Sequence, residues 1–113
     1  MHSNIIAVII AALVSSSAAL VIRNKHVGDF RLFSNQGCSA GNLGVWTIID
    51  DDVKHGKCVS INDSVQSIYA TDVNQGCKFY LYNDGACKVG KTNAAEGTCS
   101  NTSEGWKSWS MDC

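Results

Sequence analysis

The amino-acid sequence predicts an all-β sandwich made of two similar units and closed by three disulfides. Short apolar runs are bounded by clusters of Gly, Asn, Asp and Ser, and no stretch keeps a 3.6-residue apolar period for three turns. One part of the chain resembles another at an offset that falls from 49 to 41 residues. Six cysteines follow an apolar leader, and this number is enough for three disulfides.

The composition limits the class of protein. The chain has 113 residues, with nine Lys and Arg against ten Asp and Glu and a net charge of −1. This length predicts a single domain. The balanced charge gives no basis for binding nucleic acid or an anionic membrane. Three histidines leave few ways to build a catalytic or metal site.

The first 19 residues predict a secretory signal peptide. Residues 5–14 are ten consecutive apolar residues, and Ser15-Ser16-Ser17-Ala18-Ala19 follows them with small residues at cleavage spacing. This apolar stretch is about half the length that spans a bilayer. We therefore expect a secreted, extracellular protein with an N-terminal arm at 20–27 and one domain at 28–113.

The internal repeat defines the architecture. Residues 30–42 match residues 79–91 in the pattern aromatic-x-Leu-aromatic, polar turn residues, Cys, two residues, Gly. Later, residues 65–70 match 106–111. The offset changes because the first copy has eight more residues between its two cysteines. The predicted copies are 28–72 and 73–113.

The strands are expected at the apolar runs, in chain order 30–33, 45–49, 65–70, 79–82 and 106–111. Hairpin tips are expected at 35–37 and 83–85, where Asn, Asp and Gly accept positive φ. Alternation along the strands predicts an inner layer of Ile68, Ala70, Trp109 and Met111. An opposing layer is expected from Phe30, Leu32, Phe79 and Leu81.

The repeat also suggests a disulfide pairing among the fifteen possible connectivities. If each copy closes on itself, Cys38 pairs with Cys58 and Cys87 pairs with Cys99, and Cys77 then pairs with Cys113. No two cysteines have C-x₂-C spacing and no histidine cluster accompanies them, so zinc held by cysteines is not expected.

Two features resemble the βγ-crystallin-like double Greek key. One is the aromatic strand that enters a folded hairpin at 79–90, and the other is Asn62-Asp63-Ser64-Val65-Gln66-Ser67-Ile68. Cysteine replaces the usual second aromatic of the hairpin, which is similar to the small secreted, cysteine-rich, killer-toxin-like or effector-like branch of that fold. The resemblance covers 28–113 and implies a β-sandwich of two Greek-key motifs.

Calcium is the ligand that this resemblance implies. Asn62, Asp63 and Ser64 would supply oxygens, but Gln66 replaces the hydroxyl ligand of the motif. We expect no obligatory cofactor, and calcium only at this one degraded site. The alternative is a turn stabilised by Asn and Asp side chains. Asn62 and Asn101 also begin N-glycosylation sequons.

Two apparent catalytic motifs are better explained without chemistry. Residues 37–41 match G-x-S-x-G, but that motif works on a strand-to-helix turn of a larger α/β sheet. The run 50–52 with His55 could suggest a metal cluster or an acid–base pair, and a solvated loop is the commoner explanation. We therefore expect no catalytic residue and no enzyme.

Binding is the expected activity. Trp46 is the candidate binding residue because it lies on the insertion of the first copy, and function often resides on such loops. Its alternative role is to cap one end of the core. Trp106 is a second candidate, expected on the opposite face from Trp109 and partly exposed.

These features predict a monomeric, toxin-like, antimicrobial or host-directed effector that binds an extracellular protein, glycan or membrane. The alternatives are a proteinase inhibitor that presents residues 42–57, and a calcium-stabilised structural protein.

Overall fold

The computed structural model describes residues 25–113, except for the side chains of Lys54 and His55. The predicted signal peptide at 1–19 and residues 20–24 of the predicted arm lie outside the described residues. Eight strands and one short helix follow in chain order: β1 (His26–Phe33), β2 (Asn42–Ile49), the 3-10 helix η1 (Asp50–Gly56), β3 (Val59–Ser60), β4 (Ser67–Val73), β5 (Lys78–Tyr82), β6 (Thr92–Asn93), β7 (Cys99–Asn101) and β8 (Ser108–Asp112).

The strands form two antiparallel sheets of four, in the orders β2-β1-β4-β7 and β3-β8-β5-β6. The all-β prediction is therefore confirmed. Residues 26 and 27, at the end of the predicted arm, belong to β1. Within the described residues, no helix is long and apolar enough to cross a membrane.

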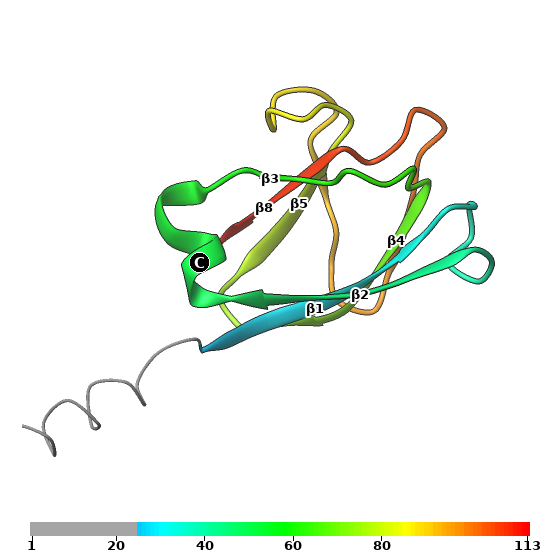
Figure 1. Ribbon diagram of the computed structural model, residues 1–113. Coiled ribbons are helices and arrows are strands. Elements are labelled where there is room, and N and C mark those ends of the chain that lie inside the picture. Colours follow the sequence, from blue (N-terminus) through cyan, green and yellow to red (C-terminus); the bar gives the residue numbers. More distant parts are fainter. Residues whose placement is uncertain (1–24) are drawn as a thin grey trace, which may run out of the picture.

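The two copies exchange their third strands. β3 belongs to the first copy but pairs with β8 of the second, and the two lie side by side in Figure 1. β7 belongs to the second copy and pairs with β4 of the first. Equivalent backbone bonds accompany the exchange: the Ile61 N–H donates to the Lys107 carbonyl, and the Thr102 N–H donates to the Gln66 carbonyl, both at 2.9 Å.

The exchange of strands changes the disulfide pairing. The six cysteines form three disulfides as predicted, and the Cys77–Cys113 bridge is confirmed. The other two predicted pairs, Cys38–Cys58 and Cys87–Cys99, are wrong. Cys38 pairs with Cys99 and Cys58 pairs with Cys87. Cys58 directly precedes β3 and Cys99 begins β7, so each is carried into the sheet of the other copy.

The core lies between the two sheets. The predicted inward side chains are all buried, namely Phe30, Leu32, Ile68, Ala70, Phe79, Leu81, Trp109 and Met111. The expected opposing layers are wrong, however. β1 pairs with β4 and β5 pairs with β8, so the predicted inward residues of each copy lie together in one layer and face those of the other copy. The equivalent residues Phe30 and Phe79 meet across the interface, with ring centroids 4.8 Å apart.

A buried serine ties down each folded hairpin. The Cys38 N–H donates to the Ser67 hydroxyl at 3.0 Å, and this hydroxyl donates to the Asn35 carbonyl. In the second copy, Ser108 makes the same two bonds to the Cys87 N–H and the Asp84 carbonyl. Both serine side chains are fully buried. Since each polar group of the hydroxyl is satisfied, the serine can be buried without an unpaired polar atom.

Positive φ does not fall where the sequence indicated. Of the residues 35–37 and 83–85, only Gly37 has positive φ. The bridged cysteines of the two hairpins take this conformation instead, Cys38 at 54° and Cys87 at 57°. L-residues rarely adopt it, and here the disulfide and the serine hold both cysteines in place.

Candidate functional site

The first copy is longer than the second in β2 and η1. The register gives Val45 and Trp46 the counterparts Asn93 and Ala94 in the second copy, so the extra residues follow Trp46, and the expected place of Trp46 on the insertion is wrong. β2 has eight residues, whereas β6, its counterpart in the second copy, has two. η1 packs beside the C-terminal end of β8, as Figure 1 shows. The acidic run 50–52 forms the first turn of this helix rather than an open loop, and the Asp52 carboxylate accepts the Ile49 N–H at 3.1 Å. The side chain of His55, the partner suggested for this run, is not described.

Trp46 lies against the core. Its ring stacks on Phe30 at 5.7 Å and meets Trp109 edge-on, also at 5.7 Å. The side chain is only partly buried, and it covers Trp109, whose Nε1 has no hydrogen-bond partner. This geometry matches the capping role that was the alternative for Trp46. A binding role for its exposed part stays a prediction.

Trp106 is not available to a ligand in this structure. Its side chain is 3% exposed and its Nε1 donates to the Ser100 carbonyl at 2.9 Å. The expectation of partial exposure is therefore wrong. Strand alternation does not apply here, because Trp106 precedes the first residue of β8. The Trp106 N–H donates to the carbonyl of Val65, its counterpart in the first copy.

The exposed apolar residues of β2 were missed. Leu43 and Val45 are 44% and 55% exposed. Val45 points away from the core because alternation along β2 turns Trp46 and Ile48 inward, whereas Leu43 lies at a register shift of β2 against β1 and has no register partner. The alternation rule could have found Val45 from the sequence, since the fold requires only one face of this strand to be buried.

Val45 begins a row of side chains across the outer face of its sheet. The strand register places Val45 beside Arg31 of β1, and Arg31 beside Tyr69 of β4. We call these three residues the outer row. Arg31 is exposed and Tyr69 is half-buried. β2 pairs only with β1, so the other edge of β2 is open within the described residues.

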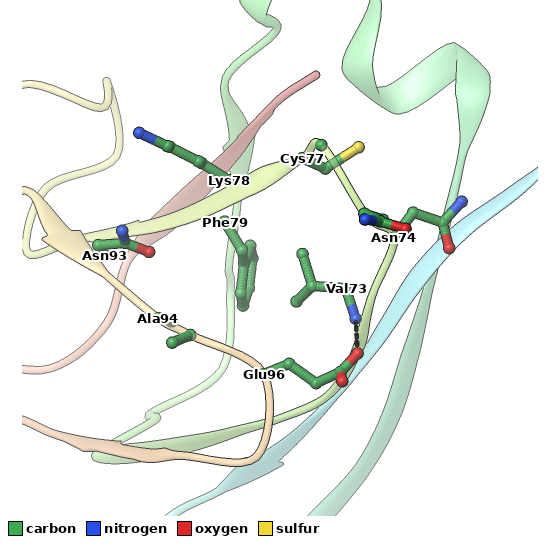
Figure 2. Close-up of a pocket in the computed structure, with 11 residues that line it drawn as sticks. Val73, Asn74, Cys77, Lys78, Phe79, Asn93, Ala94 and Glu96 are labelled. Carbon is green, nitrogen blue, oxygen red and sulfur yellow. Dashed lines mark hydrogen bonds between the residues drawn. The ribbon is translucent and has the colours of Figure 1, made fainter.

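A cavity of about 270 Å³ lies at the turn between β4 and β5. Figure 2 shows Phe79, Ala94 and Val73 facing it, with Asn74, Asn93 and Glu96 around them. The Glu96 carboxylate accepts the Val73 N–H at 2.7 Å. The Ala94 N–H bonds to the Phe79 carbonyl, so Ala94 takes the place that Trp46 has beside Phe30. The small alanine leaves this end of the second copy hollow.

The predicted calcium ligands Asn62, Asp63 and Ser64 are exposed on the loop between β3 and β4. Among the described residues, Asp63 is not grouped with two further His, Cys, Asp or Glu ligands. Both sequon asparagines, Asn62 and Asn101, are exposed, and the Asn101 side-chain oxygen accepts the Gly37 N–H at 2.7 Å. Calcium binding and glycosylation stay predictions.

Ser39, the serine of the G-x-S-x-G match, is exposed on the turn between β1 and β2. The turn is followed by a strand, so the strand–turn–helix setting of a nucleophile elbow is not formed at this point. In comparisons with known proteins, the chain matches no family model, no curated protein and no solved structure.

Proposed function

We propose that the protein is a secreted, disulfide-stabilised binding module of the βγ-crystallin-like double Greek-key type. Each sheet contains three strands of one copy and one strand from the other, which supports two interlocked Greek keys. Three disulfides are typical of extracellular proteins. The proposed role is that of a toxin-like, antimicrobial or host-directed effector.

The target that the geometry favours is an extracellular protein, bound at the outer row and Leu43. The observation that carries this proposal is the exposure of Leu43 and Val45 on a long edge strand that only the first copy has. Arginine and tyrosine, which follow Val45 in the outer row, are enriched among residues that dominate binding energy at protein interfaces. The open edge of β2 could also pair with a strand of the partner.

The alternatives receive less support. Residues 42–57 are mostly the strand β2 and the helix η1, whereas an inhibitor presents an extended, exposed loop to the protease. A carbohydrate platform would need exposed aromatic rings on the insertion, and the Trp46 ring packs on Phe30 and Trp109. A calcium-stabilised protein would show a melting temperature that rises with added calcium.

The test uses a photo-reactive amino acid at position 43 to trap the partner in extracellular fractions of candidate target cells. Binding of the purified partner is then measured for Val45→Asp and Val89→Asp. Val89 is the matched control, because it is also 55% exposed and lies in the second copy. We expect V45D to raise the Kd at least about tenfold, or about 1.4 kcal/mol, while V89D binds normally.

Equal weakening by V45D and V89D would contradict the proposed surface. The proposed surface would also be contradicted if the partner bound V45D and Arg31→Ala with the same Kd as the wild type. The melting temperatures of all variants are measured in parallel. Because these side chains are on the surface, we expect the free energy of unfolding to change by no more than about 0.5 kcal/mol.

A further inference from the structure

A histidine and two aspartates lie together at the start of β1 and the end of β4. The His26 Nε2 is 3.0 Å from an Asp29 carboxylate oxygen, and the His26 Nδ1 is 3.9 Å from an Asp72 carboxylate oxygen. One ligand atom from each residue lies within 4.8 Å of those of the other two. The side chains are 45%, 28% and 46% exposed, in the same order, so an ion can reach them from solvent.

The charges of this cluster are not balanced. Asp29 and Asp72 are register partners on β1 and β4, and like charges directly opposite one another destabilise a sheet. Among the described side chains, no lysine or arginine forms an ion pair with either carboxylate. Within the part of the chain that the structure describes, the imidazole is the only ion-pair partner of the two carboxylates, and it is charged only when protonated. A bound cation would remove the repulsion between the two carboxylates.

The second copy holds the equivalent ends of its two strands together in a different way. The counterparts of Gly28 and Asp72 are Cys77 and Cys113, and these form the disulfide that ties β5 to the end of β8. The adjacent register pair in the second copy is Lys78 with Asp112, which carries opposite charges. The first copy thus has neither the covalent tie nor the balanced pair at the equivalent end of its strands.

We propose that His26, Asp29 and Asp72 bind a divalent transition-metal ion, for which Zn²⁺ is the probe, and that this ion ties β1 to β4 as the Cys77–Cys113 bridge ties β5 to β8. Imidazole nitrogen and carboxylate oxygen both bind Zn²⁺ at about 2.0–2.2 Å. Tetrahedral bonds of that length place ligand atoms about 3.3 Å apart. Rotation of exposed side chains brings the three ligands to this spacing, and water completes the shell.

The imidazole ligand predicts which ions bind. Transition metals accept imidazole, whereas Ca²⁺ takes oxygen ligands in shells of six to eight. The site should therefore bind Zn²⁺ or Cu²⁺ and should not bind Ca²⁺. It is distinct from the degraded calcium motif at 62–64, which lies between β3 and β4.

Zn²⁺ and Ca²⁺ are titrated by calorimetry into the oxidised full chain and into His26→Ala and Asp72→Asn variants. Matched controls are His55→Ala and Asp63→Asn. We expect one Zn²⁺ per chain, a Kd at least about tenfold higher in H26A and D72N, and unchanged binding in the controls. Zn²⁺ should raise the melting temperature of the wild type but not of D72N. In ¹⁵N spectra, the imidazole signals of His26 should shift with Zn²⁺.

Three outcomes would overturn the proposal: Zn²⁺ binding that survives H26A, binding that is lost in H55A instead, or Ca²⁺ competing with Zn²⁺ at equal concentration. Melting temperatures without metal show whether each variant is folded. Removing one of the two facing carboxylates should leave the metal-free melting temperature of D72N unchanged or higher. A lower value together with lost binding would assign Asp72 a structural role and would also overturn the proposal.

Discussion

The two copies share a framework and differ at their surfaces. Both have a buried serine under the hairpin, a cysteine with positive φ, and a third strand that pairs within the sheet of the other copy. The first copy alone has a long second strand and a tryptophan against the core, where the second copy has a short strand and Ala94 beside a cavity. The shared features are those that the fold requires, whereas the differing ones are free to serve binding.

The outer faces show the same contrast. In the first copy the register aligns Val45, Arg31 and Tyr69, while the equivalent row of the second copy is Asn93, Tyr80 and Ser110. The Tyr80 ring is covered by the Lys91 ammonium, 4.2 Å from its centroid. Only the first row combines an apolar residue with exposed arginine, which is why the proposed binding surface is placed there.

The largest expected effect comes from breaking one of the two equivalent bridges. Their cysteines are 61 and 29 residues apart. In the chain-entropy model, replacing Cys38 and Cys99 by alanine costs about 4.3 kcal/mol, and replacing Cys58 and Cys87 costs about 3.6 kcal/mol. Urea unfolding of the two double variants measures both values.

Peptide mapping of the oxidised protein provides the control for that experiment. It should recover Cys38 linked to Cys99 and Cys58 linked to Cys87. Recovery of a Cys38–Cys58 peptide would show that the copies close separately, and the strand exchange would then be wrong.

Trp46→Ala tests the asymmetric filling of the core. Fully buried tryptophans lose about 3–5 kcal/mol on truncation, and Trp46 is partly exposed, so we expect about 2–3 kcal/mol. Trp46→Phe retains the contact with Phe30 and should lose less. Thermal unfolding measures the effect. Unchanged stability in W46A, with lost binding of the partner, would instead assign the ring to recognition.

Ser67→Ala and Ser108→Ala test whether the two hairpins are equivalent. Each variant leaves the N–H of a cysteine and a hairpin carbonyl without their partner, which costs about 1–3 kcal/mol. We expect the two losses, measured by urea unfolding, to agree within about 0.5 kcal/mol. A large loss in only one variant would break the comparison.

The smallest effect concerns pH and exists in one copy alone. The N–H groups of Val89 and Lys88, and then that of Ala86, donate to the Asp84 carboxylate and lower its pKa below 3.8. The counterpart in the first copy, Asn35, cannot ionise. Because the folded pKa is depressed, this stabilisation is complete above about pH 4 and is lost as the pH falls through the lowered pKa.

Melting temperatures of the wild type and Asp84→Asn, measured from pH 2 to 6, check this prediction. The two curves should converge at the acid end and separate above about pH 4, with the wild type more stable. A constant difference across the range would mean that the carboxylate charge does not contribute.

The sequence was sufficient for the strand class, the buried residues and the equivalence of cysteines, because these depend on local pattern. It was insufficient for the partners of Cys38 and Cys87. Closure within a copy and exchange between copies place the same residues in equivalent positions, so the repeat cannot distinguish them. The choice depends on where β3 and β7 find hydrogen-bond partners, and those strands have only two and three residues.

The candidate site was predicted in part. The segment between Cys38 and Cys58 was predicted correctly to be the longer one, but Trp46 does not lie among its extra residues, and the exposed side chains are those of its neighbours Leu43 and Val45. Burying the large apolar ring of Trp46 against the core is more favourable in free energy than exposing it to water. Leu43 and Val45 are therefore the exposed apolar residues of β2. The predicted partial exposure of Trp106 was wrong because this residue lies outside a strand, where side chains no longer alternate between two faces.

The exchange of β3 and β7 between the two sheets has a consequence for the origin of the molecule. A half-chain that ends after β4 would keep Cys38 and Cys58 without the thiols they bond to, and its sheet would lack a fourth member. Two identical halves could satisfy each other, Cys38 of one with Cys58 of the next and vice versa. Such a covalently linked homodimer, joined end to end by gene fusion, would become this monomer without any change of pairing.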